Sequence, residues 1–290
     1  MSRTEQKPLS IEEAFAYCER LARTHYENFT VGSWFLPRGV RRHVYSVYAY
    51  CRSVDDLGDE AKGDRLAHLD RWEEELRRSH DGTATHPVMV ALGETNRRFQ
   101  IPIEPYLKLI EANRMDQTVH RFPTYADLLH YCDHSANPVG HLFLYLFGYR
   151  DPERQRLADC TCTALQLTNF WQDVRRDLDM GRIYIPMEDM ERFVYSEAEL
   201  ERSEVNDAFR RLMAFEVARA RSLFEEGLQL VDMVEGAAKL DIKLFSLGGM
   251  RVLDAIERAG YDVLSKRPAL SKREKIGLML STMVKLKLAG

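Results

Sequence analysis

Helix-start signals recur along this 290-residue chain, and they limit its fold more than any other feature. A serine or threonine followed three residues later by an acid can form a capping box, which satisfies backbone N–H groups of the first helical turn. Such pairs are Ser10 with Glu13, Thr124 with Asp127, Ser196 with Glu199, and Ser271 with Glu274. Apolar residues recur at helical spacing over 10–28, 38–60, 64–78, 86–98, 103–118, 124–147, 152–179, 196–233, 238–260 and 271–287, and no alternating run predicts a strand. We therefore predict an all-α fold in a single domain over 1–290.

Composition excludes several classes of protein. The net charge is -4 and no lysine–arginine cluster resembles a nucleic-acid footprint, so we expect no nucleic-acid partner. The longest strongly apolar run, 142–149, is far below the roughly 20 residues of a membrane span, and the N-terminus lacks a signal-peptide core. Five cysteines without a CxxC pair fit reduced thiols rather than a zinc site. We expect a soluble cytoplasmic protein with at most peripheral contact with the inner membrane, for which the mildly basic C-terminal KLKLAG is one contact candidate.

The segment RSVDDLGDE places acids on a predicted helix beside an apolar run. Tyr48, Arg52, Asp55 and Asp59 lie at offsets 0, 4, 7 and 11, which fall on one helical face. Asp55 and Asp59 are one turn apart, so their carboxylates would repel each other. A divalent cation between them would relieve that repulsion.

A second polar stripe of similar spacing lies in LQLTNFWQDVRRDLDMGRIYIP. Gln166, Asn169, Asp173 and Asp177 lie at offsets 0, 3, 7 and 11, among apolar neighbours that should be buried. Oxygen ligands in such surroundings suit a hard cation such as Mg²⁺.

The two acid pairs could be either a solvated helix surface or a functional metal site. A single DxxxD pair on a helix is usually a solvated surface, but two pairs with aromatic neighbours favour a functional site. We expect two facing acidic helices to hold a diphosphate through Mg²⁺, whereas zinc fits less well because no histidines or thiols accompany the acids. His130 and His134 lie one turn apart but do not form a recognised metal motif. The adjacent Gly248 and Gly249 are expected to allow close helix packing.

These two segments resemble the squalene and phytoene synthase family. YAYCRSVDDLGDE is similar to its first aspartate-rich motif and LQLTNFWQDVRRDLDMGRIYIP to its second, while FLPRGVRRHVYSVYAYCR and YCDHSANPVGHL also match. The resemblance covers most of residues 25–190 and implies a class I isoprenoid synthase helical bundle with a central cavity. Phe170, Trp171 and Gln172 replace the commonest residues of the second motif. With SANPVG at 135–140, they resemble the bacterial hydroxysqualene synthase branch.

The resemblance implies a role for each set of site residues. Mg²⁺ ions would be held by Asp55, Asp59, Asn169, Asp173 and Asp177, and the substrate diphosphate would be bound by Arg52, Arg38 or Arg42, and Arg182. Gln166, Phe170 and Trp171 would also bind the substrate. The aromatic rings of Tyr48, Tyr131, Phe170 and Trp171 would stabilise a carbocation. Asn137 would position water, and Pro138 would kink its helix.

The implied reaction converts presqualene diphosphate and water to hydroxysqualene in squalene and hopanoid synthesis, with Mg²⁺ and without NADPH. One alternative is another head-to-head synthase, which makes presqualene diphosphate, dehydrosqualene or phytoene from two prenyl diphosphates. Two others are a non-catalytic assembly or membrane-interaction factor of the same fold and a Mg²⁺-binding bundle with unrelated chemistry. Neighbouring enzymes of the squalene pathway are expected partners, and the oligomeric state stays open.

Overall fold

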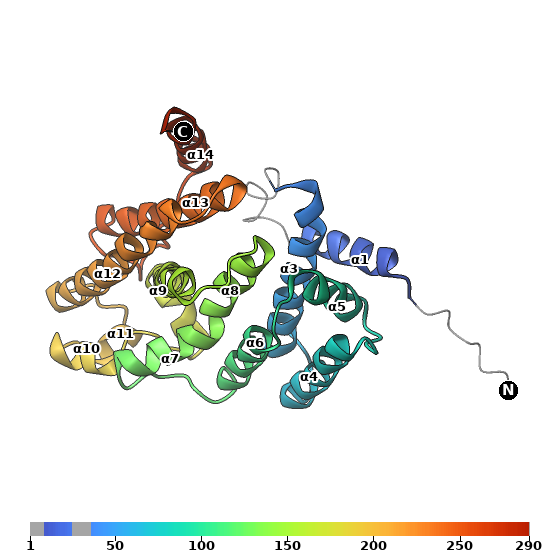
Figure 1. The fold of residues 1–290 in the computed structure, drawn as a ribbon. Helices are drawn as coiled ribbons and strands as arrows, with labels where there is room; N and C mark the ends of the chain where they lie inside the picture. The colour runs from blue at the N-terminus through green and yellow to red at the C-terminus, as the bar shows by residue number, and fades with distance from the viewer. Residues whose placement is uncertain (1–8, 25–35, 290) are drawn as a thin grey trace. The chain divides into compact units, whose positions relative to one another are not determined.

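The computed structural model describes residues 9–24 and 36–289, and these residues form helices joined by turns (Figure 1). Within these residues, β-pairing is confined to one bridge between Arg121 and Ile183. The prediction of an all-α fold is therefore confirmed. Residues 25–28 of the helix predicted over 10–28 lie outside the described residues.

The chain divides into two compact units, one of which contains residues 118–140 and 151–290. Residues up to 117, together with 141–150, form another. The single domain over 1–290 stays a prediction. The elements are α1 (Ile11–Thr24), α3 (Arg38–Asp59), α4 (Arg65–Asp81), α5 (Pro87–Phe99), α6 (Glu104–Met115), α7 (Tyr125–Ser135), α8 (Asn137–Leu146), α9 (Pro152–Asp179), α10 (Met187–Arg192), α11 (Glu197–Glu201), α12 (Asp207–Gly227), the 3-10 helix η1 (Leu228–Asp232), α13 (Gly236–Arg258) and α14 (Lys272–Ala289).

All four predicted capping boxes form. In each, the hydroxyl accepts a hydrogen bond from the backbone N–H three residues on, and the acid accepts one from the capping residue's backbone N–H. These local interactions set the first residue of α1, α7, α11 and α14. Helix starts were therefore predictable at these positions from residue type and spacing alone.

Three predicted segments need correction. The helix over 124–147 divides at Ala136 into α7 and α8, at the Asn137-Pro138 step that was expected to kink it. The helix over 196–233 breaks after α11, where Ser203 takes the left-handed conformation (φ 56°), and Asn206 then caps α12. The stretch 180–195, between the helices predicted over 152–179 and 196–233, contains the short helix α10, which begins just after Pro186.

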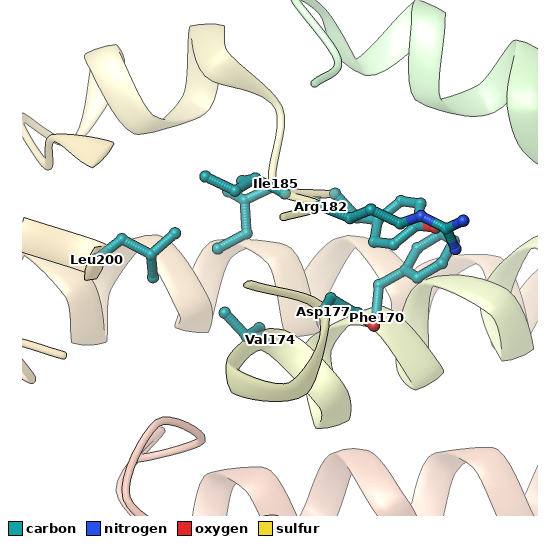
Figure 2. A pocket seen from close by; sticks show the side chains of 8 residues that line it. Phe170, Val174, Asp177, Arg182, Ile185 and Leu200 are labelled. Atoms are coloured by element: carbon teal, nitrogen blue, oxygen red, sulfur yellow. The ribbon is translucent and has the colours of Figure 1, made fainter. Parts of the chain in front are cut away.

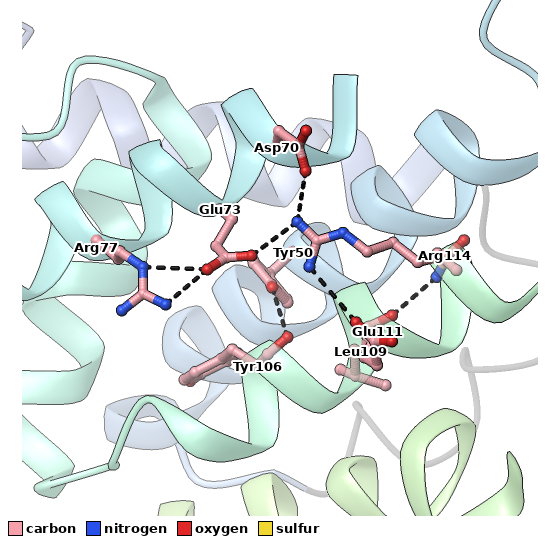
Figure 3. Close-up of polar contacts among 9 residues, drawn as sticks. Tyr50, Asp70, Glu73, Arg77, Tyr106, Leu109, Glu111 and Arg114 are labelled. Carbon is pink, nitrogen blue, oxygen red and sulfur yellow. Dashed lines mark hydrogen bonds and ion pairs between the residues drawn. The ribbon is translucent and has the colours of Figure 1, made fainter. Parts of the chain in front are cut away.

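In the first unit, α3 packs against α1, α4, α5 and α6. The buried Tyr50 hydroxyl donates a hydrogen bond to the backbone oxygen of Tyr106, which ties α3 to α6. Arg114 of α6 pairs with Asp70 at 2.7 Å and Glu73 at 2.8 Å on α4, as Figure 3 shows. These contacts fix α6 beside the acidic end of α3.

In the second unit, α9 packs against α7, α12 and α13. The segment after α9 is held by backbone hydrogen bonds from Ile183 to His120 (3.0 Å) and from Met187 to Phe122 (2.9 Å). A Cβ on Gly249 would lie 2.2 Å from Phe224, so this glycine does permit close packing of α13 on α12. At Gly248 a Cβ would meet nothing within 4 Å, so only half of the glycine prediction is confirmed.

All five cysteines are unpaired thiols. Across the described ranges, no helix has the length and apolar character that crossing a membrane requires.

Candidate active site

The acidic stripe of α3 combines one neutralised cation with two carboxylates. Arg52 pairs with Asp56 at 2.5 Å and Glu60 at 3.0 Å, on the flank of the stripe. Asp55 and Asp59 keep solvent-exposed surface, and Tyr48 is half-buried. The four predicted residues are therefore in one continuous helix, as their spacing required.

A side chain of α6 supports this stripe. The Asn113 amide donates hydrogen bonds to Asp55 Oδ1 at 3.4 Å and to the Leu109 backbone oxygen at 3.0 Å. Gly58 lies directly beneath that amide, where a Cβ would come within 2.0 Å of Asn113 Oδ1. The glycine therefore lets α6 approach closely enough to orient Asp55.

The stripe of α9 is held from the C-terminal side of the chain. Arg267, in the loop between α13 and α14, donates to both oxygens of Asp173 at 2.5 and 2.8 Å and to Gln172 Oε1 at 2.8 Å. Gln172 also donates to the Pro268 backbone oxygen. A cationic side chain thus already pairs with one acid of the stripe, and a metal ion there would share or displace it.

In each acid pair, the pKa of one carboxyl is raised by burial and by the charge of the other, although nearby cations offset part of this rise. Protein atoms around the Asp55 carboxyl raise its pKa to about 7, although part of it reaches solvent, and the neighbouring charge of Asp59 adds to the rise. Burial also raises the pKa of Asp177 to about 7, with a further contribution from Asp173. A cation bound at either pair would stabilise the ionised carboxylates.

The oxygen ligands of the two stripes suit Mg²⁺, but they do not enclose it on all sides. Among the described residues, no group of three histidine, cysteine, aspartate or glutamate side chains is placed to enclose a metal. Each stripe offers two carboxylates, and the α9 stripe also has the exposed amide of Asn169 and the half-buried Gln166. Magnesium commonly binds to one or two carboxylates and takes its remaining oxygens from water and substrate phosphates. The residues therefore fit an ion that is bound together with a phosphate ligand.

Aromatic rings gather beside the α9 stripe. Phe170 stacks on Tyr184 with ring centroids 3.8 Å apart, and Tyr131 packs against both rings. Figure 2 shows the adjoining pocket, which is lined by Phe170, Val174, Asp177, Arg182, Ile183, Tyr184, Ile185 and Leu200. Its volume of about 10 Å³ has room for about one water, so the rings would have to separate to admit a prenyl chain there.

A wider groove of about 630 Å³ opens elsewhere on the second unit, but no predicted site residue lines it. Trp171, expected to contact substrate, is fully buried in the core. Tyr131 and Phe170 are also buried, but they belong to the aromatic group beside the small pocket.

Of the remaining predicted residues, Arg182 lies beside an acid of the site and Arg42 does not. Arg182 lines the small pocket with Asp177. Arg42 lies about a third of a turn from the α3 stripe, where it pairs with Glu12 at 3.1 Å and stacks over Phe15, so the structure does not bring it to the acids. Arg38 begins α3, and its side chain lies outside the described part. Asn137 is buried and accepts a hydrogen bond from Thr163 at 2.9 Å.

Sequence reasoning missed Asn113, Arg267 and Tyr184. Asn113 and Arg267 contact acids 58 and 94 residues away in the chain, and no local spacing indicates such partners. Tyr184 lies within the quoted second motif, so its proximity could have been considered. That both acid pairs act on one diphosphate stays a prediction.

The helical fold carries one acid pair on α3 and, in the other unit, a second acid pair on α9 that lies beside aromatic rings, and these are features of an isoprenoid synthase. The squalene/phytoene synthase family model matches residues 22–274, and the chain belongs to this family of head-to-head prenyl diphosphate synthases. The chain resembles the crystal structure of squalene synthase HpnC from Alicyclobacillus acidocaldarius, with 50% identity, a TM-score of 0.85, and coverage of 88% of this chain and 97% of that one.

Two further relatives agree on the family. A dehydrosqualene synthase solved in complex with a ligand is 27% identical with a TM-score of 0.87, over 96% of this chain and 98% of that one. The 15-cis-phytoene synthase of Synechococcus elongatus is 32% identical over 89% of this chain and 88% of its own length. Family members act on prenyl diphosphates.

Proposed function

We propose that this protein is a hydroxysqualene synthase, which converts presqualene diphosphate and water to hydroxysqualene and diphosphate with Mg²⁺ and without NADPH. The observation that carries the proposal is the 50% identity to squalene synthase HpnC, against 32% to the phytoene synthase. The second motif, with Phe170, Trp171 and Gln172, supports the same branch.

The chain's own groups would bind the diphosphate as follows. Asp55 and Asp59 on α3, and Asn169, Asp173 and Asp177 on α9, would hold Mg²⁺, which neutralises negative charge that develops on a departing diphosphate. Arg182 and Arg267 lie beside the α9 acids and can donate charge-assisted hydrogen bonds to phosphate oxygens. Arg267 would first release Asp173, and Arg52 would loosen its pairs with Asp56 and Glu60.

The balance of the reaction sets the remaining requirements. The bond between carbon and the diphosphate oxygen breaks and leaves a cyclopropylcarbinyl cation, which rearranges before water adds to it. Water forms the new carbon–oxygen bond and loses a proton, which the released diphosphate can accept. Once Phe170 and Tyr184 separate, these rings and Tyr131 would offer aromatic faces that stabilise a cation and exclude water from it.

The first experiment incubates the purified protein with Mg²⁺ and presqualene diphosphate, without NADPH, in water enriched in heavy oxygen. We expect labelled hydroxysqualene by mass spectrometry, with turnover lost in Asp55→Asn and in Asp173→Asn. Asp179→Asn is the matched control, because Asp179 is also on α9 but is exposed and pairs with Arg175. An unlabelled hydrocarbon product, or no turnover, would contradict the proposal.

A condensing synthase is the second candidate, and the phytoene synthase relatives favour it. The same protein incubated with farnesyl or geranylgeranyl diphosphate separates the two. Presqualene diphosphate, dehydrosqualene or phytoene as product would assign that activity in place of the proposed one.

A further inference from the structure

Helix α14 exposes a row of large apolar side chains. Ile276, Leu280 and Val284 are 54%, 55% and 56% exposed, which is unusual for three aliphatic residues at a spacing of four. Each step of four advances about 40° around the helix axis, so the three side chains form one stripe over about 12 Å. We call Ile276, Leu280 and Val284 the outer stripe.

The opposite side of α14 is already occupied. The helix packs against α13, and Thr282 between the last two stripe residues is 1% exposed. Arg258 of α13 also pairs with Glu274 at 3.4 Å. The helix is therefore anchored on one side, and its outer stripe is turned away from that anchor. Leu278 and Met279 are partly exposed. Apolar residues thus occur around the helix, and their positions in the sequence do not by themselves show which side faces outward.

Positive charge accompanies the outer stripe. The sequence of α14 contains five lysines and arginines (Lys272, Arg273, Lys275, Lys285 and Lys287) and one acid, Glu274. Glu274 caps the helix through Ser271 and pairs with Arg258, so its charge is largely satisfied within the protein. Lys272, Arg273 and Lys275 are exposed.

An apolar stripe flanked by cations fits a particular partner. We propose that α14 docks this protein on a lipid bilayer that carries anionic headgroups, with the outer stripe entering the acyl boundary and the basic residues contacting the headgroups. Interfacial helices combine these two contributions, and long basic side chains reach headgroups while apolar neighbours insert. A second copy of the chain fits less well, because pairing two α14 helices would bring the exposed Lys272, Arg273 and Lys275 of both copies together.

The test measures flotation of the full chain with vesicles, and it needs no substrate. Vesicles of neutral phosphatidylcholine are compared with vesicles that also contain anionic phosphatidylglycerol. We expect binding to the anionic vesicles, weakened by added salt because exposed charges are screened. No binding to anionic vesicles, or equal binding to neutral ones at all salt concentrations, would overturn the proposal.

Variants assign the surface. Replacing all three residues of the outer stripe by serine should lower the partition constant of the protein onto anionic vesicles by about tenfold or more. Leu280→Ser is paired with Leu66→Ser, because Leu66 is also an exposed helical leucine (44%) but belongs to α4. Lys272→Gln with Lys275→Gln should weaken binding and flatten its salt dependence.

Two outcomes contradict this assignment. The first is equal loss of vesicle binding in Leu66→Ser and Leu280→Ser. The second is a dimer in light scattering that the serine variants dissociate while vesicle binding persists. Circular dichroism confirms that each variant is folded, and the salt dependence of the unmodified protein tests the electrostatic part without any substitution. Because vesicle binding is measured without turnover, its failure is separate from failure of the proposed reaction.

Discussion

Gly58→Ala tests how α6 supports the acids of α3. The added Cβ would lie 2.0 Å from Asn113 Oδ1, 2.9 Å from its Cγ and 3.1 Å from its Cβ, all closer than an ordinary contact of 3.4–4 Å. Rotating the amide away does not relieve the contact with the Asn113 Cβ. The buried amide would also leave Asp55 and the Leu109 backbone oxygen.

The expected magnitude follows from opposing contributions. Overpacking costs about 1–3 kcal/mol, and a lost hydrogen bond adds about 1 kcal/mol. Replacing a helical glycine by alanine returns about 1 kcal/mol. The net loss in free energy of unfolding is therefore about 1–3 kcal/mol. Gly248→Ala, where nothing lies within 4 Å of the new Cβ, should instead gain about 0.5–1 kcal/mol.

Urea unfolding of Gly58→Ala and Gly248→Ala measures the difference in their free energies of unfolding. Turnover of presqualene diphosphate measures how the Gly58→Ala substitution affects the function of Asp55. We expect Gly58→Ala to lower kcat by about tenfold or more, because under the proposed function a displaced Asp55 would displace the Mg²⁺ that neutralises the departing diphosphate. If Gly58→Ala were as stable and as active as the unmodified protein, Asn113 would not be a support of the α3 stripe. Gly248→Ala should keep full activity.

Three further predictions concern the second unit. Gly249→Ala should destabilise the protein by about 1–3 kcal/mol, because the new Cβ would lie 2.2 Å from Phe224, and urea unfolding would show the loss. Burial raises the pKa of Glu216 to about 8, so the unfolded chain releases this proton first and stability falls as pH rises from about 4.5 to about 8. Glu216→Gln should remove about 3–5 kcal/mol of that decline in unfolding measured across this range, and an unchanged slope would contradict the assignment. Asp177→Asn should raise the melting temperature of the metal-free protein near pH 8 by removing a repelling carboxylate, yet lower turnover by at least about tenfold, whereas Asp179→Asn should do neither.

Local sequence determined where several helices begin and which side chains share a helical face. The capping boxes at Ser10, Thr124, Ser196 and Ser271 needed only residues three positions apart. The periodicity also placed 152–179 on one helix, and α9 has these bounds. By contrast, periodicity predicted a continuous helix through Ser203. The left-handed turn there ends the helix, but no glycine or proline in the sequence marks it.

Tertiary structure decided what those helical faces meet. Asn113 and Arg267 reach Asp55 and Asp173 because packing brings distant segments together, and helical spacing carries no information about such contacts. The pKa of Asp55 depends on the protein atoms around it, which composition does not specify. The same reason applies to α14: its apolar residues occur on both sides, and only its packing on α13 shows that the outer stripe faces away from the core.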